Sequence, residues 1–137
     1  MRTAQLLRWV LVVPAAFAGW VLALGVGLGL HAIAQRLCPP ALVVSGMCTA
    51  SWFRPVEQAI SIGSAALAAV LIVSFAVLSA PSHKRRIAAL AYLCGAVAAI
   101  LMGVSAGAIV EAGAALVAGL ATLSIALRRR SALVSAR

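Results

Sequence analysis

The cysteines are the first residues of this chain whose chemistry deserves a test, because two of them share its one long polar stretch. Cys38 and Cys48 lie ten residues apart within QRLCPPALVVSGMCTASWFRPVEQ, whereas Cys94 sits inside an apolar run. The pair predicts a structural disulfide, which would stabilise the fold by roughly 2.5–3 kcal/mol on the loop-entropy estimate. Two free thiols and a redox-active pair are the alternatives that the spacing leaves open.

Glu111 is the one charged residue between Ile87 and Leu127. A carboxylate inside a membrane span is a candidate for proton coupling in transport. Arg128 follows Glu111 by 17 residues, about 25 Å along a helix, so the two belong at opposite membrane surfaces. An acidic residue in the first turn of a helix also complements the helix dipole. The sequence favours this cap-like role and keeps Glu111 as a possible transport residue.

The other titratable residues form no recognisable constellation. His31 lies at the outer end of the first predicted span, and His83 lies in the loop on the opposite side of the membrane. They are separated by about the thickness of the bilayer, so they cannot ligate one haem or metal ion. The sequence has no His, Cys, Asp and Glu cluster at metal-ligand spacing, no phosphate-binding loop, no catalytic triad and no carboxylate pair. It therefore predicts no cofactor, no metal and no catalytic residue, and it favours a non-catalytic protein without deciding the question.

Composition assigns the chain to a broad class. Hydrophobic residues make up 65% of its 137 residues and charged residues 9%, and the mean hydropathy is +1.16. Soluble domains are roughly 45–50% apolar, and a small soluble domain could not bury so much apolar surface. The net charge of +9 gathers at the ends of apolar runs. That pattern indicates contact with a bilayer whose inner leaflet is anionic, and not nucleic-acid binding.

Four apolar runs are long enough to cross a bilayer, which takes about 20 residues each. The last run, 41 residues from Ile87 to Leu127 with Glu111 as its one charge, would form a helix of roughly 60 Å. It must therefore divide into two spans, and the break falls near Gly107. The sequence predicts an all-α, integral membrane four-helix bundle in a single domain, 1–137. The predicted spans are residues 9–33, 59–80, 87–106 and 110–127, with one long loop at 34–58. The first run exceeds the 7–15 apolar residues of a signal peptide, so a retained span is expected.

Basic residues give the predicted orientation. Two cations, Arg36 and Arg54, lie in the 34–58 loop, and the other nine lie in the tails and the middle loop. These nine are Arg2, Arg8, Lys84, Arg85, Arg86, Arg128, Arg129, Arg130 and Arg137. The positive-inside rule then predicts cytoplasmic termini, an outward 34–58 loop and residence in a bacterial inner membrane. The expected interface anchors are Trp52, Phe53, Lys84, Arg85, Arg86, Arg128, Arg129 and Arg130.

Small residues at four-residue spacing predict close helix packing, within the chain or between copies. The candidates are Gly25 with Gly29, Gly103 with Gly107, and Ala115 with Gly119. With no visible catalytic apparatus, the sequence predicts an accessory or assembly subunit of a larger envelope complex, with other membrane proteins or further copies as partners. The alternative is a small oligomeric transporter, flippase or pore.

Overall fold

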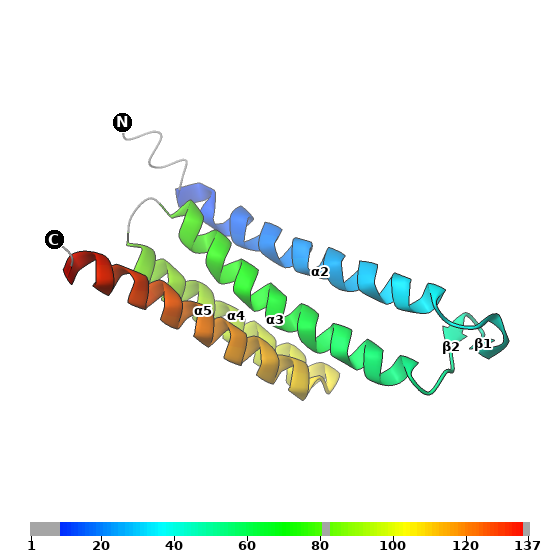
Figure 1. Ribbon diagram of the computed structural model, residues 1–137. Coiled ribbons are helices and arrows are strands. Elements are labelled where there is room, and N and C mark those ends of the chain that lie inside the picture. Colours follow the sequence, from blue (N-terminus) through cyan, green and yellow to red (C-terminus); the bar gives the residue numbers. More distant parts are fainter. Residues whose placement is uncertain (1–8, 81–82, 136–137) are drawn as a thin grey trace.

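The structure, a computed structural model, describes residues 9–80 and 83–135 and contains four long helices (Figure 1). They are α2 (Val12–Arg36), α3 (Phe53–Ser79), α4 (Lys84–Ala106) and α5 (Ile109–Ser135). All four are long and apolar enough to cross a membrane. This confirms an all-α protein with four candidate membrane spans.

The connection between α2 and α3 folds into a small hairpin. It contains a 3₁₀ turn, η1 (Pro40–Leu42), and two short antiparallel strands, β1 (Val43–Val44) and β2 (Met47–Cys48). Ser45 and Gly46 join the strands with φ angles of 52° and 80°. Positive φ at both central residues is what a type I′ hairpin turn requires, and glycine adopts it without strain.

The structure holds Cys38 and Cys48 at disulfide distance, with their Cα atoms 5.9 Å apart. The predicted pairing and the observed pairing are therefore the same. The bond joins the end of β2 to the residues that directly follow α2, so it ties the hairpin to the helix. We call the end of the molecule that carries this hairpin the hairpin end.

Helices α3, α4 and α5 are longer than the apolar runs that predicted them, whereas α2 has the predicted 25 residues and lies three residues later than the predicted span 9–33. Helix α3 begins at Phe53, six residues before the predicted span at 59, and α4 begins at Lys84, three before 87. Pro55 is accommodated because it falls in the first turn of α3, where a missing N–H matters least. Arg2, Arg8 and Arg137 lie outside the described residues, as do the side chains of Arg129 and Arg130.

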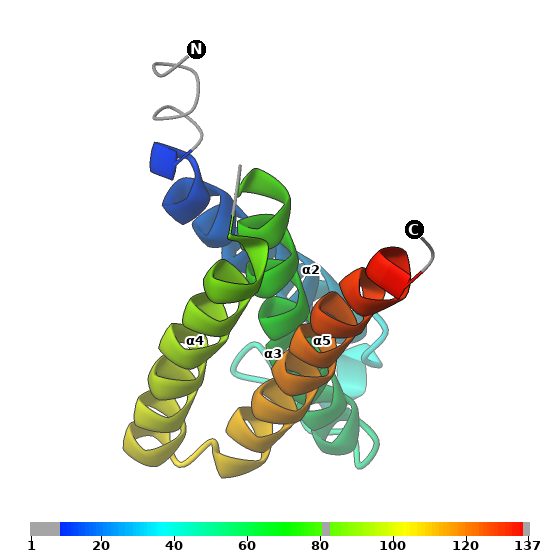
Figure 2. The same cartoon turned by 90° about the vertical axis from the view of Figure 1, so that its left-hand side faces the viewer.

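Helix α3 is the centre of the arrangement. It packs against α2 on one side and against α4 and α5 on the other, while α2 has no extensive contact with α4 or α5 in the part of the chain that the structure describes. Seen from one end, α4 and α5 form a V with α3 behind them (Figure 2). The four helices are packed together, but α2 has a single helical neighbour along its length.

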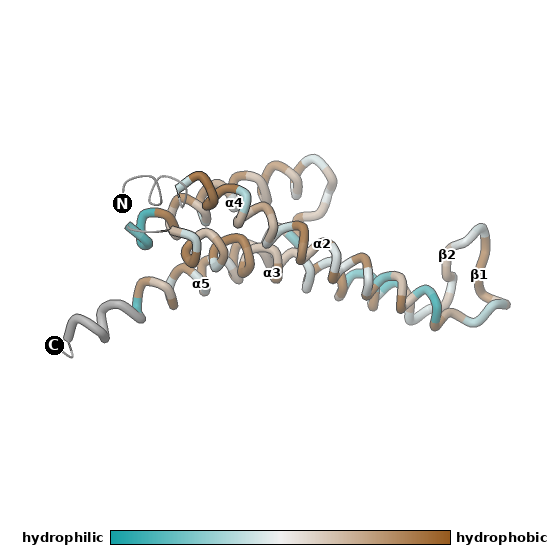
Figure 3. Tube along the Cα trace, turned by 90° about the horizontal axis from the view of Figure 1, so that it is seen from above, coloured by the Kyte–Doolittle hydropathy of each residue, from teal (hydrophilic) through white to brown (hydrophobic). Residues whose placement is uncertain are grey.

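The α2–α3 pair extends beyond the turn that joins α4 to α5, as two perpendicular views show (Figures 1 and 3). Gly107 makes that turn possible, because it ends α4 with a φ of 70°. Figure 3 also shows hydrophilic residues gathered on the extended part of α2 and α3, close to the hairpin. We call this extended part, together with the hairpin, the headpiece.

The helix interfaces are built from small residues. Of the nine buried apolar residues among those described, six are alanines. These are Ala23, Ala34, Ala50, Ala76, Ala80 and Ala88, and the other three are Cys38, Phe53 and Val73. Small side chains let helix backbones approach closely, which is the main source of packing energy where lipid replaces water.

Candidate functional site

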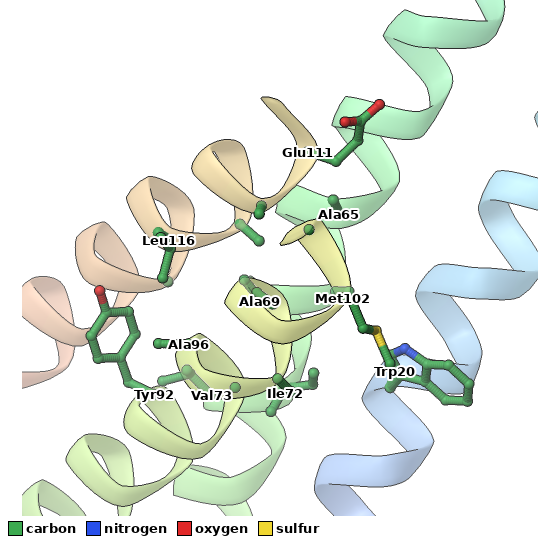
Figure 4. Close-up of a pocket in the computed structure, with 18 of the residues that line it drawn as sticks. Trp20, Ala65, Ala69, Ile72, Val73, Tyr92, Ala96, Met102, Glu111 and Leu116 are labelled. Atoms are coloured by element: carbon green, nitrogen blue, oxygen red, sulfur yellow. The ribbon is translucent and has the colours of Figure 1, made fainter. Parts of the chain in front are cut away.

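An apolar cleft of about 280 Å³ lies between α3, α4 and α5, with Trp20 of α2 at its edge (Figure 4). Most of its lining consists of alanine and glycine, whose short side chains leave space between the three helices. Larger side chains come from Ile72 and Val73 of α3, Met102 of α4 and Leu116 of α5. Such a surface can bind an apolar chain but offers little to a polar solute.

Glu111 is the only charged residue of the cleft lining. It lies in the first turn of α5, where the helix dipole favours a carboxylate. Figure 4 shows it at one end of the cleft beside Ala65, with its oxygen atoms directed away from Tyr92. The side chain is half-buried, and no salt bridge involves it within residues 9–80 and 83–135. The cleft therefore ends in a carboxylate available to a positively charged group.

The headpiece contains a second cluster of polar groups. His31 Nδ1 of α2 lies 3.8 Å from Glu57 Oε1 of α3, and the Gln35 amide nitrogen lies 3.0 Å from His31 Nε2. The amide N–H donates to Nε2 when that imidazole nitrogen is unprotonated. Both partners of the pair are substantially exposed, with 34% of the His31 side chain and 50% of the Glu57 side chain accessible. Exposed pairs of this kind contribute about 0–1 kcal/mol, so the cluster adds little to the stability of the fold.

Phe53 forms the apolar support beneath these polar groups. It is 6% exposed, packs with Ala34 and Ala50, and meets the His31 ring edge-to-face at 5.9 Å. Trp52 packs on Phe53 at the same centroid distance but is 38% exposed. Of the two aromatic residues expected as interface anchors, the structure buries Phe53 between the hairpin and α2. Only Trp52 presents a substantial surface.

The contact between α2 and α3 uses a stripe of small residues, Gly19, Ala23 and Gly27. A Cβ built on Gly19 would lie 2.9 Å from the backbone of Leu71, and one on Gly27 would lie 2.5 Å from Ser64 Oγ. Ala23, between them, is 1% exposed. The same construction at Gly25 and Gly29 meets nothing within 4 Å. The predicted Gly25–Gly29 pair thus faces away from α3, and the stripe next to it makes the contact.

The other expected packing residues behave individually. A Cβ on Gly103 would approach Ala112 to 2.7 Å, and one on Gly119 would approach the Tyr92 ring to 3.0 Å, so both glycines lie at helix contacts. Ala115 lines the cleft. Gly107 serves the α4–α5 turn and meets no neighbour within 4 Å.

The basic residues flank the apolar parts of the helices. Lys84, Arg85 and Arg86 form the first turn of α4, where cations oppose the helix dipole by about 0.3–1 kcal/mol each. Arg128, which ends the apolar part of α5, is exposed. Cys94 is an exposed free cysteine on α4.

Sequence reasoning missed both the cleft and the contact between His31 and Glu57. The cleft leaves no sequence signal, because alanine-rich helices are as compatible with tight packing as with a gap. The position of His31 did have a sequence signal. It continues the four-residue spacing of Gly19, Ala23 and Gly27, the stripe of α2 that meets α3. Among the described residues, no group of three His, Cys, Asp or Glu could hold a metal ion. Compared with protein-family models, curated proteins and solved structures, the chain matches none.

Proposed function

We propose that this protein is a non-catalytic, multi-pass inner-membrane protein of a bacterium that acts as an accessory or assembly subunit of a larger envelope complex. The observation that carries the proposal is the packing of α2, which has α3 as its single extensive neighbour. Its Gly25–Gly29 face is open, and exposed Val21 and Leu28 flank it. An open small-residue face lets a further membrane helix approach α2 closely.

The proposed orientation has both termini in the cytoplasm and the headpiece outside. Lys84, Arg85 and Arg86 support it, because three cations at the start of α4 are unfavourable for the helix itself. Anionic headgroups of the inner leaflet offset this cost, at about 1 kcal/mol per basic residue. An exterior headpiece also suits the disulfide, since oxidising compartments preserve such bonds.

Co-purification in mild detergent tests the subunit proposal. The full chain should retain a membrane protein in fixed stoichiometry, and Gly25→Leu combined with Gly29→Leu should release it. Gly63→Leu is the matched control, because Gly63 of α3 is also exposed with nothing within 4 Å. A wild-type protein that elutes alone as a monomer would contradict the proposal, as would equal retention by both variants.

A small oligomeric transporter, flippase or pore is the second candidate, and one observation favours it. Glu111 is a carboxylate in the lining of a cleft between three candidate membrane spans, and ionisable residues among such helices often mark transport pathways. In this case the retained partner would be a second copy of the chain. Replacing Glu111 with Gln should then abolish proton-coupled flux in reconstituted vesicles, and unchanged flux would exclude that coupling.

A further inference from the structure

We propose that the cleft between α3, α4 and α5 binds one phospholipid with a primary ammonium headgroup, phosphatidylethanolamine, with its ammonium on Glu111 and an acyl chain among the alanines. This inference does not depend on the subunit proposal, because it concerns another face of the molecule. It rests on the size of the cleft, its length, its lining and the charge at its end.

The size of the cleft selects a narrow occupant. A helix with its side chains is about 10–12 Å wide and rises about 5.4 Å per turn. The three helices that form the cleft already contact one another, α3 with α4 and α5, and α4 with α5, so a fourth helix has no room to enter between them. A single acyl chain is a much thinner apolar group, and the surrounding bilayer supplies it at high concentration.

The length of the cleft matches one leaflet. Along α4 its lining runs from Ala91 to Gly103, which is about 18 Å at the helical rise. One leaflet contributes about half of a hydrocarbon core of roughly 30 Å. The lining is therefore about one leaflet long, and an acyl chain that starts at the Glu111 end would run along most of it toward Tyr92.

The position of Glu111 suits a headgroup. Helix α4 extends about 33 Å from Lys84 to Ala106, close to the full hydrocarbon thickness. If Lys84 lies at one surface, the turn after Ala106 lies near the other, and Glu111 is in the first helical turn beyond it. Its carboxylate, directed away from the apolar end of the cleft in Figure 4, is placed to meet polar groups of a lipid.

The carboxylate also selects the headgroup chemistry. A negative charge repels anionic lipids and attracts an ammonium group. Primary ammonium N–H groups can donate charge-assisted hydrogen bonds to the carboxylate, which are stronger than hydrogen bonds between neutral groups. The quaternary ammonium of phosphatidylcholine has no N–H and cannot form them. Phosphatidylethanolamine is therefore expected to bind ahead of both phosphatidylcholine and phosphatidylglycerol.

Native mass spectrometry of the full chain, released from bilayer discs of equal phosphatidylethanolamine, phosphatidylcholine and phosphatidylglycerol content, tests the proposal. The wild type should carry one phosphatidylethanolamine in preference to the other two. Glu111→Gln should weaken that binding about ten-fold, the equivalent of about 1.4 kcal/mol, and should not weaken the binding of the other two lipids. Glu57→Gln is the matched control, because it removes the same charge in the headpiece and should have no effect.

A second pair of variants tests the acyl-chain site independently of charge. Ala96→Phe places a ring in the cleft and should lower the retention of all three lipids. Val104→Phe adds a ring on an exposed position of the same helix, outside the lining, and should leave retention unchanged. Equal binding of the three lipids by the wild type would overturn the proposal. So would loss of binding in Glu57→Gln, full retention in Ala96→Phe, or a dimer that carries no lipid.

Discussion

Replacing Gly19 or Gly25 of α2 by alanine should show how much the contact between α2 and α3 contributes to stability. The comparison of the two variants cancels the effects that any glycine-to-alanine change has on a helix. Gly19 and Gly25 lie in the same helix, but a Cβ on Gly19 would meet the Leu71 backbone at 2.9 Å, whereas one on Gly25 meets nothing within 4 Å. Both replacements add one methyl group and the same intrinsic helix preference. We expect Gly19→Ala to destabilise the protein and Gly25→Ala to leave it unchanged or slightly more stable.

The magnitude follows from the geometry. Ordinary van der Waals contact begins at 3.4 Å, so α2 must move from α3 by about 0.5 Å to admit the methyl group of Gly19→Ala. The obstacle is backbone of α3 and cannot rotate away. Overpacking of this kind costs about 1–3 kcal/mol, while alanine in place of glycine favours a helix by about 0.5–1 kcal/mol. The second effect is common to both variants, so their difference should be the overpacking alone, about 1–3 kcal/mol.

Unfolding of the purified variants in mixed micelles, titrated with a denaturing detergent and followed by circular dichroism, measures this difference. Gly25→Ala is the reference for Gly19→Ala, because the preference of alanine over glycine in a helix is the same in both variants. Equal free energies of unfolding for the two variants would refute the assignment of the α2–α3 contact to the stripe of Gly19, Ala23 and Gly27. Destabilisation by Gly25→Ala alone would assign the contact to the Gly25–Gly29 face instead.

Other measurements address the headpiece and the orientation. A maleimide polymer should add to Cys38 and Cys48 only after reduction, and labelling without reduction would contradict the pairing. The double variant Cys38→Ser with Cys48→Ser should have a free energy of unfolding lower by roughly 2.5–3 kcal/mol. Phe53→Ala should speed hydrogen exchange in the hairpin, because it removes about 3 kcal/mol of buried contact, whereas Glu57→Gln should change the exchange rate little. Faster exchange in Glu57→Gln than in Phe53→Ala would contradict the role of Phe53 as the apolar support. Fluorescent-protein fusions at either terminus should both fluoresce in the cytoplasm, and a dark fusion at one end would contradict an even number of spans.

The number of helices could be predicted because the bilayer thickness fixes the length of one span at about 20 residues, and the apolar runs can be measured in the sequence. The 41-residue run from Ile87 to Leu127 is too long for one crossing, so the chain must turn within it. The glycine at the turn, Gly107, can be recognised in the sequence. Gly107 adopts a φ of 70°, which side chains other than glycine rarely tolerate. The disulfide was predictable for a similar reason, since the chain offers two cysteines in a short loop and a third far from them.

Helix facing could not be predicted in the same way. Helix α2 carries Gly19, Ala23 and Gly27 on one stripe and Gly25 with Gly29 on another, and each stripe has the four-residue spacing that close packing requires. Which stripe meets α3 depends on the surface that α3 offers, where Leu71 exposes backbone and Ser64 has a short side chain. That surface is a tertiary property, and in an alanine-rich chain hydropathy does not distinguish one face of a helix from another.

The start of α3 shows why helix length and span length must be kept apart. Hydropathy assigns Arg54, Glu57 and Gln58 to a loop, because these residues are unfavourable in lipid. The structure places all three in a continuous helix that begins at Phe53. A polar helical turn is stable where a neighbour supports it, and Phe53 provides that support by packing on Ala34 of α2. Once the disulfide hairpin fixes the end of α2, α3 has a partner along its first turns, so both helices continue past the α4–α5 turn and form the headpiece.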